Sequence, residues 1–393
     1  MSKRVFLIVL DSFGIGGAKD ADLFFDEGSN TLKSVSKQNG FYAPNLQKLG
    51  LFNIDNVDSA VKGIANPIGC YARVEEKSAG KDTTIGHWEI AGAITKTPFP
   101  TYKNGFPSDI INTFSALTGR GVLCNKPYSG TKVILDYGRE HISTGDLIVY
   151  TSSDSVFQIA SHEQVVSVEK LYKYCEIARK LLVGKDAVAR VIARPFTGEY
   201  PYFTRTANRK DFSLSPPKNM LDKLIENGKS VIAVGKISDI FNGRAISESL
   251  HTVSNNDGER KTIDLLKKDF TGLCLVNLVD FDMLYGHRND PIGYSRAITE
   301  FDKSLGVILN NLGNEDILMI TADHGCDPET ASTDHSRENV PLLAYGKNLK
   351  KGVNLHTRNT FSDISATILD YFDIKNDLAG TSFLGELQWI LHL

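Results

Sequence analysis

Asp316-Ile317-Leu318-Met319-Ile320-Thr321-Ala322-Asp323-His324-Gly325-Cys326-Asp327 is the stretch that decides the fold of this chain. Its apolar run, residues 317–320, is too short for a typical helix and is bounded by polar residues, which favours a strand covered on both faces. Asp323 and His324 follow the carboxyl end of that strand. Because ligands bind at the carboxyl ends of strands in open α/β sheets, these two side chains are candidates for a binding site.

Two other segments repeat this arrangement. The apolar run 5–10 ends in Asp11, and the run 273–279 ends in Asp280, with Asp282 and His287 just beyond. Each of the three predicted strands therefore places a carboxylate at its end. The repetition indicates one shared metal site.

Length and composition narrow the class of protein. With 393 residues the chain is expected to form about two domains, and 41% hydrophobic and 23% charged residues are ordinary for a globular protein. A net charge of −3 and a pI near 6.3 give no reason to expect nucleic acid or a membrane as a partner. The five cysteines are scattered without metal-type spacing, so a reducing cytoplasm is the expected location.

The alternation of apolar strands and amphipathic helices divides the chain into two parts. Residues 1–98 and 216–393 predict an α/β core, a mostly parallel sheet with helices on both faces. Pro98 and Pro100 interrupt this pattern, and residues 99–215 read as an inserted α+β domain. The core is expected to resume with a helix that has Ser215 as its N-cap and Pro216 at its first position.

The polar loop that contains Thr83 has two compatible interpretations. A threonine in such a loop is usually a helix cap, and Ile90, Ala91 and Ala93 could begin the apolar face of the helix. A hydroxyl at a helix N-terminus also lies among free N–H groups that attract phosphate, which suits a phosphate-carrying nucleophile. Both interpretations can hold together.

Six candidate metal ligands follow strand ends or lie in a nearby loop. Singly, each is more often a hydrogen-bonded polar side chain than a ligand, but together they match the needs of two divalent ions, and mixed carboxylate and imidazole ligands suit Mn²⁺ or Zn²⁺. Two metals can clamp the attacking and leaving oxygens of a displacement at phosphorus, with Thr83 as the hydroxyl. The ligands are Asp11, Asp282, His287, Asp323, His324 and His335.

The motifs around these residues resemble the alkaline phosphatase superfamily and, more closely, the bacterial phosphopentomutase family. The resemblance spans the whole chain. Its most specific part is Lys81-Asp82-Thr83 followed by Gly86-His87-Trp88-Glu89, where the related cofactor-independent phosphoglycerate mutases carry Asn-Ser. The other matching segments are 9–12, 280–288, 321–325 and 334–338. Ile85 stands where the family is expected to have Thr, and Lys19 where it is expected to have Pro.

The resemblance implies a role for each ligand. One metal is expected on Asp11, Asp323 and His324, close to the oxygen of Thr83, and a second on Asp282, His287 and His335. Thr83 is expected to be the phosphorylated nucleophile. Asp280 and Asp334 are expected to be neighbours rather than ligands.

The resemblance also implies the reaction. Family members are expected to use Mn²⁺ and to interconvert ribose 1-phosphate and ribose 5-phosphate, and the 2-deoxy forms, through a bisphosphate. A sugar bisphosphate is expected to prime Thr83. The inserted domain is expected to act as a cap that excludes water.

Substrate binding requires cations for the phosphate that is not transferred and polar partners for the sugar. Most arginines and lysines are solvated surface charges. By resemblance the expected binding residues are Arg194, Arg205, Arg209 and Lys236 for phosphate and Ser152 and Asp154 for the sugar.

Two rival functions remain open from the sequence. The first is a metal-dependent phosphatase or sulfatase on the same core, and the second is a metal-binding module without catalytic activity. Small pentose phosphates are the expected partners. The sequence does not decide the oligomeric state, for which a monomer is one option. It also leaves open the preference between ribose and deoxyribose.

Overall fold

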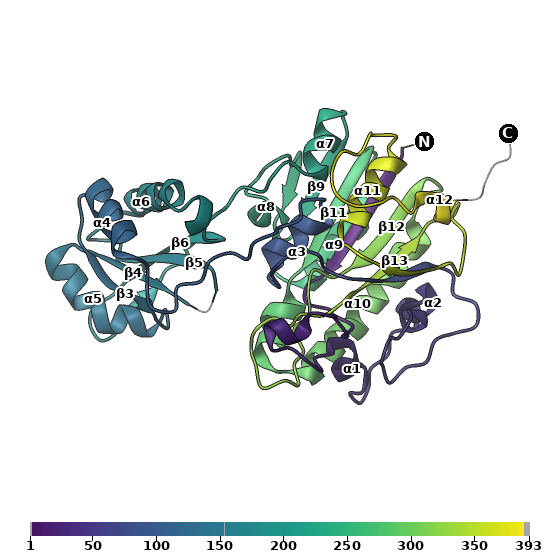
Figure 1. Ribbon diagram of the computed structural model, residues 1–393, viewed down its shortest axis with the longest axis horizontal. Coiled ribbons are helices and arrows are strands. Elements are labelled where there is room, and N and C mark those ends of the chain that lie inside the picture. The colour runs from purple at the N-terminus through teal and green to yellow at the C-terminus, as the bar shows by residue number, and fades with distance from the viewer. Residues whose placement is uncertain (1, 153, 389–393) are drawn as a thin grey trace. The chain divides into compact units, whose positions relative to one another are not determined.

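The computed structural model describes residues 2–152 and 154–388, so that position 153 in the predicted sugar-binding segment lies outside the described residues. The chain divides into two compact units, Met1–Thr97 with Pro216–Leu393, and Pro98–Ser215 (Figure 1). Each unit has its own sheet. The two units are described separately below.

The sheet of the first unit has the strand order β10-β9-β11-β1-β12-β13-β2-β14. The neighbours from β10 to β12 are parallel, whereas β13 is antiparallel to both β12 and β2, and β14 pairs in parallel with β2. The predicted mostly parallel sheet is therefore confirmed. The strands are β1 Arg4–Leu10, β2 Cys70–Val74, β9 Ser230–Val234, β10 Glu248–Leu250, β11 Gly272–Leu278, β12 Asp316–Thr321, β13 Val340–Tyr345 and β14 Asn354–Arg358.

Strand β1 lies between β11 and β12 at the centre of this sheet. All of its residues are buried, as are all residues of the two neighbouring strands. Burying one such aliphatic side chain stabilises the fold by roughly 1.5–3 kcal/mol, which explains the continuous apolar runs in the sequence. Leu10 pairs with Leu278, and Val9 pairs with Thr321. The three strands therefore end at nearly the same level, and the residues that follow them emerge together.

The helices of the first unit form two groups, one on each side of the sheet (Figure 1). In one group α10 contacts α1, α2 and α9, and in the other α11 contacts α3 and α7. The helices and short turns are η1 Ala21–Phe24, α1 Thr31–Ser36, α2 Pro44–Leu49, η2 Leu51–Asn53, α3 Thr83–Ile90, α7 Met220–Glu226, α8 Ile237–Ile240, α9 Asn255–Leu265, η4 Phe281–Tyr285, η5 Gly286–Arg288, α10 Pro291–Asn311, α11 Ser362–Tyr371 and α12 Leu384–Leu387.

The predicted start of the helix after the insertion was wrong by several residues. Helix α7 has Asn219 as its N-cap, not Ser215, and Pro216 precedes the helix. The Asn219 side chain accepts a hydrogen bond from Leu221 N, and Asp222 accepts one from Asn219 N. This reciprocal pair satisfies two otherwise free N–H groups, so the helix begins there rather than at the proline.

The second unit folds around a sheet with the order β3-β4-β5-β6-β7, and β8 also pairs with β6. One core cluster includes Phe114 of α4 and Phe157 of β5, and the other includes Tyr150 of β4 and Phe196 of β6. The elements are β3 Val122–Pro127, β4 Leu147–Thr151, β5 Val156–His162, β6 Arg190–Thr197, β7 Thr204–Arg205, β8 Lys210–Ser213, α4 Ser108–Thr118, α5 Lys132–Thr144, α6 Val168–Leu181 and η3 Gly184–Asp186.

A buried histidine in the second unit is expected to make stability depend on pH. The Nδ1 of His141 bonds to the Asp146 carbonyl oxygen at 2.5 Å, and its Nε2 accepts from His162 N at 2.9 Å, which requires a neutral ring. Burial lowers the pKa of His141, and the nearby His162 and Arg120 add to this effect. Below about pH 6.5 the unfolded chain therefore binds more protons than the folded one.

We expect the free energy of unfolding to fall as the pH drops below about 6.5, by at most about 1.4 kcal/mol per pH unit from this residue. Above that pH the contribution of His141 is constant. Denaturant titrations at several pH values would measure the effect on the wild type and on His141→Gln, whose amide does not titrate. Identical pH dependence in the two proteins would refute the assignment to His141.

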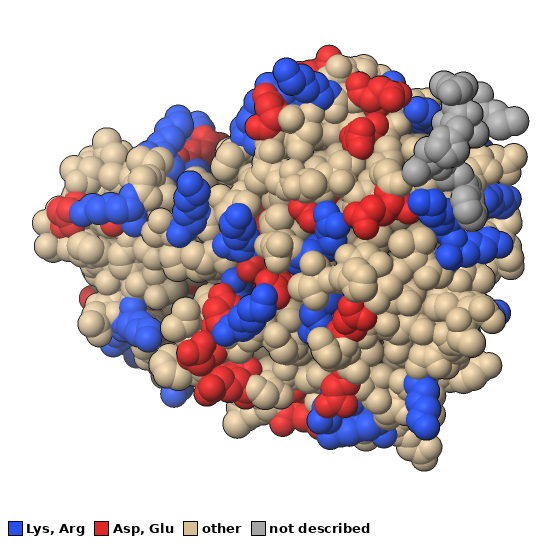
Figure 2. All heavy atoms as spheres, turned by 45° about the vertical axis from the view of Figure 1, so that its right-hand side comes forward, with Lys and Arg blue, Asp and Glu red and all other residues tan. Residues whose placement is uncertain are grey.

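The surface carries both signs of charge. On the face shown in Figure 2, Lys and Arg side chains are interspersed with Asp and Glu, as expected for a net charge of −3. Among the residues that the structure describes, no helix combines the length and the hydropathy needed to cross a bilayer.

Candidate metal centre

The six predicted ligands all lie in the first unit, at or near the carboxyl edge of its parallel strands. Asp11 follows β1, Asp323 and His324 follow β12, and Asp282 lies in η4 after β11. His287 lies in η5, and His335 lies in the loop before β13. Within the described residues, these side chains fall into overlapping groups whose ligand atoms lie within 4.8 Å of one another. Two such groups are Asp11 with Asp323 and His324, and Asp282 with His324 and His335.

The first group is fully enclosed. Asp11 and Asp323 are 0% exposed, and His324 is 1% exposed. His324 Nε2 lies 3.5 Å from Asp11 Oδ1 and 3.4 Å from Asp323 Oδ2. The backbone N–H of Ser12 donates to Asp323 Oδ1 at 3.1 Å and fixes the orientation of that carboxylate. Two acidic groups and one imidazole thus converge without access to bulk water.

Burial and neighbouring charges shift the pKa values of the two carboxylates in this group in opposite directions. Burial raises the pKa of Asp11 to about 7, and the charges of Asp323 and Asp282 add to the increase. Burial also acts to raise the pKa of Asp323, but His324 and His87 outweigh it, so that this pKa is lowered. The raised pKa of Asp11 is the expected response of converging carboxylates.

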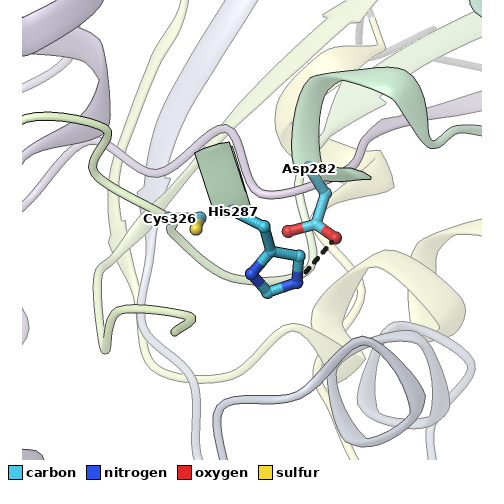
Figure 3. A group of neighbouring side chains, drawn as sticks. All are labelled: Asp282, His287 and Cys326. Atoms are coloured by element: carbon cyan, nitrogen blue, oxygen red, sulfur yellow. Dashed lines mark ion pairs between the residues drawn. The ribbon is translucent and has the colours of Figure 1, made fainter. Parts of the chain in front are cut away.

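Asp282 connects this group to two further imidazoles. His287 Nε2 lies 3.2 Å from Asp282 Oδ2, the pair drawn in Figure 3, and His335 Nε2 lies 3.4 Å from Asp282 Oδ1. The His335 ring lies close to both other imidazoles, tilted relative to each, with its centroid 3.9 Å from that of His324 and 4.7 Å from that of His287. Burial acts to raise the pKa of Asp282, but His335 and His287 hold it well below its ordinary value.

Thr83 is the first residue of α3, and its side chain reaches this cluster. Thr83 Oγ1 lies 3.0 Å from His324 Nε2. The helix can come so close because residue 86 is glycine: a Cβ there would lie 2.2 Å from the Asp323 carbonyl oxygen. A hydroxyl, an imidazole and two carboxylates therefore form one site.

Two expectations about the Thr83 loop were wrong in detail. The N-cap of α3 is Asp82 rather than Thr83, because the Asp82 carboxylate accepts hydrogen bonds from both Thr84 N and Ile85 N. Those N–H groups are therefore already bonded and are not free to bind phosphate. The helix ends at Ile90 rather than beginning its apolar face there.

Two supporting residues were missed at the sequence level. His87 Nδ1 lies 2.9 Å from the Thr83 carbonyl oxygen and 3.0 Å from Asp323 Oδ2, and Asn277 Nδ2 donates to Asp11 Oδ2 at 2.7 Å. They link the Thr83 helix and strand β11 to the two carboxylates. The position of His87 one helical turn after Thr83 was the available signal for its role, whereas Asn277 is hidden inside an apolar run.

The donor set fits divalent cations. Asp11 Oδ1, Asp282 Oδ1 and His335 Nε2 are buried and make no hydrogen bond to any part of the chain that the structure describes. Buried polar atoms without partners cost free energy, and cations bound at the two clusters would satisfy them. Carboxylate oxygens with imidazole nitrogens are ligands for Mn²⁺ or Zn²⁺.

Removal of divalent metal is expected to lower the melting temperature. The folded chain holds the converging carboxylates, whereas the unfolded chain does not, so a bound cation stabilises only the folded state. At a free metal concentration 100 times its Kd the gain is about 2.7 kcal/mol. Scanning calorimetry with excess Mn²⁺ and with EDTA would measure the shift. Equal melting temperatures in the wild type would contradict the metal assignment.

Three of the predicted phosphate-binding arginines gather in the second unit. Burial lowers the pKa of Arg194, and the nearby charges of Arg209 and Arg205 lower it further. Arg194 Nε donates to Gln158 Oε1 at 3.2 Å, and Arg205 Nε donates to the Gly130 carbonyl oxygen at 3.2 Å. Neither of these bonds neutralises the charge of its arginine. Arg194 and Arg205 are therefore suited to an anion, whereas Arg209 is already paired with Asp211.

Asp154 belongs to a network that the sequence did not indicate. Its carboxylate lies 3.8 Å from Arg190, which lies 3.6 Å from Asp211, and Arg209 forms a bidentate pair with Asp211 at 2.8 and 2.9 Å. Asp154 and Arg209 are thus connected within one unit.

The two remaining predicted binding residues, Ser152 and Lys236, lie in different units of the chain. Ser152 Oγ accepts from Asp154 N at 3.3 Å, next to the network just described. Lys236 is exposed in the first unit, at the start of α8.

Comparison of the sequence with those of known proteins identifies the family of this chain. The model of the metalloenzyme superfamily matches residues 3–376. The chain is 57% identical over 385 residues to a phosphopentomutase of Lachnoclostridium phytofermentans, covering 98% of this chain and 99% of that protein. Phosphopentomutases of Clostridium novyi and Acetivibrio thermocellus are each 56% identical, over 98% of this chain and 100% of their own length.

Identity at this level over nearly the full length of both chains extends through both units, so the similarity is not confined to the metal-binding motifs. The superfamily match also agrees with the buried carboxylate and imidazole cluster and with the alkaline phosphatase-like α/β class. The chain belongs to the metalloenzyme superfamily and, within it, to the phosphopentomutases, a family of isomerases.

Proposed function

We propose that this chain interconverts ribose 1-phosphate and ribose 5-phosphate, and the corresponding 2-deoxyribose phosphates, through phosphorylated Thr83. The observation that carries the proposal is the 3.0 Å separation between Thr83 Oγ1 and His324 Nε2 beside buried carboxylates, in a member of the phosphopentomutase family. The relatives are named for this activity, and a hydroxyl beside buried carboxylates and an imidazole supports phosphoryl transfer through Thr83.

The ligands are proposed to hold two divalent ions, with Mn²⁺ the expected metal. Asp11, Asp323 and His324 would hold one, and Asp282, His287 and His335 the other. When bound, the ions would neutralise charge on the transferring phosphoryl group and favour the deprotonated form of the hydroxyl. His87 and Asn277 would keep Asp323 and Asp11 oriented, through the contacts described above.

The reaction would proceed by two transfers that involve the same residue. In the first, the free hydroxyl of a bound pentose monophosphate attacks the phosphorus of phospho-Thr83. The bond from phosphorus to Thr83 Oγ1 breaks, the threonine hydroxyl regains a proton, and a sugar 1,5-bisphosphate forms.

In the second transfer, Thr83 Oγ1 attacks the other phosphoryl group of the bisphosphate, the bond from that phosphorus to the sugar oxygen breaks, and the sugar hydroxyl gains the proton that Thr83 loses. The isomeric monophosphate then leaves, and phospho-Thr83 is restored. Because each cycle begins and ends with phospho-Thr83, a sugar bisphosphate would be needed once, to prime the threonine.

The second unit would bind the part of the substrate that does not react. Arg194, Arg205 and Arg209 would hold the phosphate that stays on the sugar, Ser152 and Asp154 would bind sugar hydroxyls, and Lys236 of the first unit would add a cation. A cap function for residues 99–215 would keep water from phospho-Thr83, because hydrolysis would convert the isomerase into a phosphatase. Small pentose phosphates in the cytoplasm would be the substrates.

One assay separates the proposal from its nearest rival. The purified chain is incubated with ribose 1-phosphate, Mn²⁺ and a trace of sugar bisphosphate, and both ribose 5-phosphate and inorganic phosphate are measured. Isomer formation without phosphate release is expected. Phosphate release without isomer formation would identify a phosphatase, and no turnover by a metal-loaded preparation would indicate a binding module.

Arg194→Met is expected to raise KM for ribose 5-phosphate by about 10- to 100-fold, because a hydrogen bond to a charged group is worth about 1.5–3 kcal/mol. The half-buried guanidinium is held by Gln158 and has no carboxylate bonded to it in the contacts above, so its charge is available to a phosphate. Steady-state kinetics measure KM, and the matched control is Arg139→Met, which removes an exposed arginine of α5. Equal KM values in the two variants would remove Arg194 from the binding site.

A further inference from the structure

Cys326 has a buried thiol and lies two residues after His324, one of the candidate metal ligands. Its side chain is 1% exposed, and its position is fixed because its backbone N–H lies 3.1 Å from both the Ser12 carbonyl oxygen and Thr31 Oγ1. The thiol makes a long contact, 3.5 Å, with the Asp334 carbonyl oxygen, and it also interacts with the side chain of His287. Its surroundings approach closely: a Cβ at Gly286 of η5 would lie 2.9 Å from the sulfur.

Cys326 lies beside two of the ligands assigned above. Asp282, His287 and Cys326 each offer one ligand atom, and these three atoms lie within 4.8 Å of one another. Figure 3 shows the sulfur on the side of the His287 ring that faces away from the nitrogen paired with Asp282. The second carboxylate oxygen of Asp282 is turned toward the same space.

A second observation indicates that this space is suited to a cation. Asp282 is only 7% exposed, and its Oδ1 makes no hydrogen bond within the described ranges. A carboxylate, an imidazole and a thiol are ligands that zinc binds in proteins, at about 2.0–2.3 Å. Because His287 Nδ1 bonds to the Thr333 carbonyl oxygen at 2.7 Å, His287 would bind an ion through Nε2, and the Cys326 side chain would have to rotate toward that nitrogen. The set with a sulfur is softer than the set with His335 in its place.

We propose that Asp282, His287 and Cys326 form an alternative, thiol-containing ligand set that binds thiophilic divalent metals such as Zn²⁺ and Cd²⁺. On binding, a metal–sulfur bond forms and the thiol proton leaves to solvent, with no change of oxidation state. Asp282 and His287 also belong to the proposed Mn²⁺ set with His335, so the two occupancies exclude each other. Only this competition rests on the proposed function; the binding of the soft metal does not.

The binding is tested by titrating the metal-depleted full-length chain with Cd²⁺ and recording the ultraviolet sulfur-to-cadmium charge-transfer band. The wild type is expected to develop the band as one equivalent binds. Cys326→Ser is expected to lose it and to bind Cd²⁺ at least about tenfold more weakly, as for other losses around a metal site. The matched control, Cys124→Ser, removes a more accessible thiol of the second unit and is expected to keep the band. Circular dichroism checks that both variants fold.

The competition is tested on the Mn²⁺-loaded chain. Free Mn²⁺ is followed by electron paramagnetic resonance as Cd²⁺ is added, and the wild type is expected to release Mn²⁺ at a lower Cd²⁺ concentration than Cys326→Ser. A wild type without the charge-transfer band, or a band of equal strength in Cys326→Ser, would overturn the proposed ligand set. Neither readout depends on enzyme turnover. The charge-transfer band therefore tests the ligand set separately from the mutase activity: an inactive chain can show the band, and an active mutase can lack it.

Discussion

Thr83→Ala is expected to lower kcat for the isomerisation of ribose 1-phosphate by at least about 10⁴-fold, as the loss of a nucleophile does in other covalent mechanisms. The substitution removes the one atom that carries the phosphoryl group between the two transfers. Metal content is expected to stay at the wild-type level, because Thr83→Ala leaves all six carboxylate and imidazole side chains in place and removes only a hydroxyl beside His324. A large loss of activity at constant metal content is the signature of a nucleophile rather than of a structural residue.

Thr83→Ser is the matched variant, because it keeps the hydroxyl and removes one methyl group. It is expected to become phosphorylated when primed with a sugar bisphosphate, which mass spectrometry of the peptide around residue 83 can detect, whereas Thr83→Ala is not. Elemental analysis would give the metal content of all three proteins. Activity of Thr83→Ala within tenfold of the wild type would rule out the nucleophile assignment.

The clustering of the candidate ligands could be predicted because each buried parallel strand appears in the sequence as a continuous apolar run. Strands β1, β11 and β12 are covered on both faces, so each is a continuous apolar run, and the polar residue after each run marks its end. Their pairing in the order β11-β1-β12 is what brings Asp11, Asp282 and Asp323 together. The pattern predicted the ends of the strands, and the resemblance supplied the division of ligands between two metals.

Helix starts were less predictable because several polar residues compete for each cap. Asp82 and Asn219 are the N-caps of α3 and α7, where Thr83 and Ser215 had been expected. A capping side chain is chosen by its reach to N–H groups two and three residues ahead, and that geometry depends on how the preceding loop folds. In α7 the choice is fixed by Asp222, whose bond to Asn219 N closes a capping box.

Contacts between distant segments were not predictable from one sequence. Cys326 comes close to His287 only because η5 follows β11 and Cys326 follows β12, and these strands flank β1. The ion pairs that link Asp154 to Arg209 pass through Arg190 and Asp211, which lie on β6 and β8. Neither set has a spacing in the chain that would single it out.

Asp323→Asn is expected to lower the affinity for one Mn²⁺ by at least about 100-fold and to reduce occupancy from two ions toward one per chain. The amide is nearly isosteric and can still accept the hydrogen bond that Ser12 N donates to Oδ1. What it lacks is the negative charge at Oδ2, which faces His87 at 3.0 Å and His324 at 3.4 Å. The loss is therefore electrostatic, and the buried position prevents water from replacing the missing charge.

The same substitution should also change the protonation of its neighbour. The charge of Asp323 helps to raise the pKa of Asp11, so the pKa of Asp11 should fall in Asp323→Asn, leaving Asp11 ionised but with too few partners to hold a cation tightly. Isothermal titration with Mn²⁺ measures the affinity. Asp334→Asn is the matched control, because Asp334 lies beside His335, its side chain is half exposed, and it is absent from the clustered ligand sets. Equal Mn²⁺ occupancy in Asp323→Asn and Asp334→Asn would remove Asp323 from the ligands. If only Asp323→Asn loses Mn²⁺ and its Thr83 is no longer phosphorylated, the lost ion is the one beside the nucleophile.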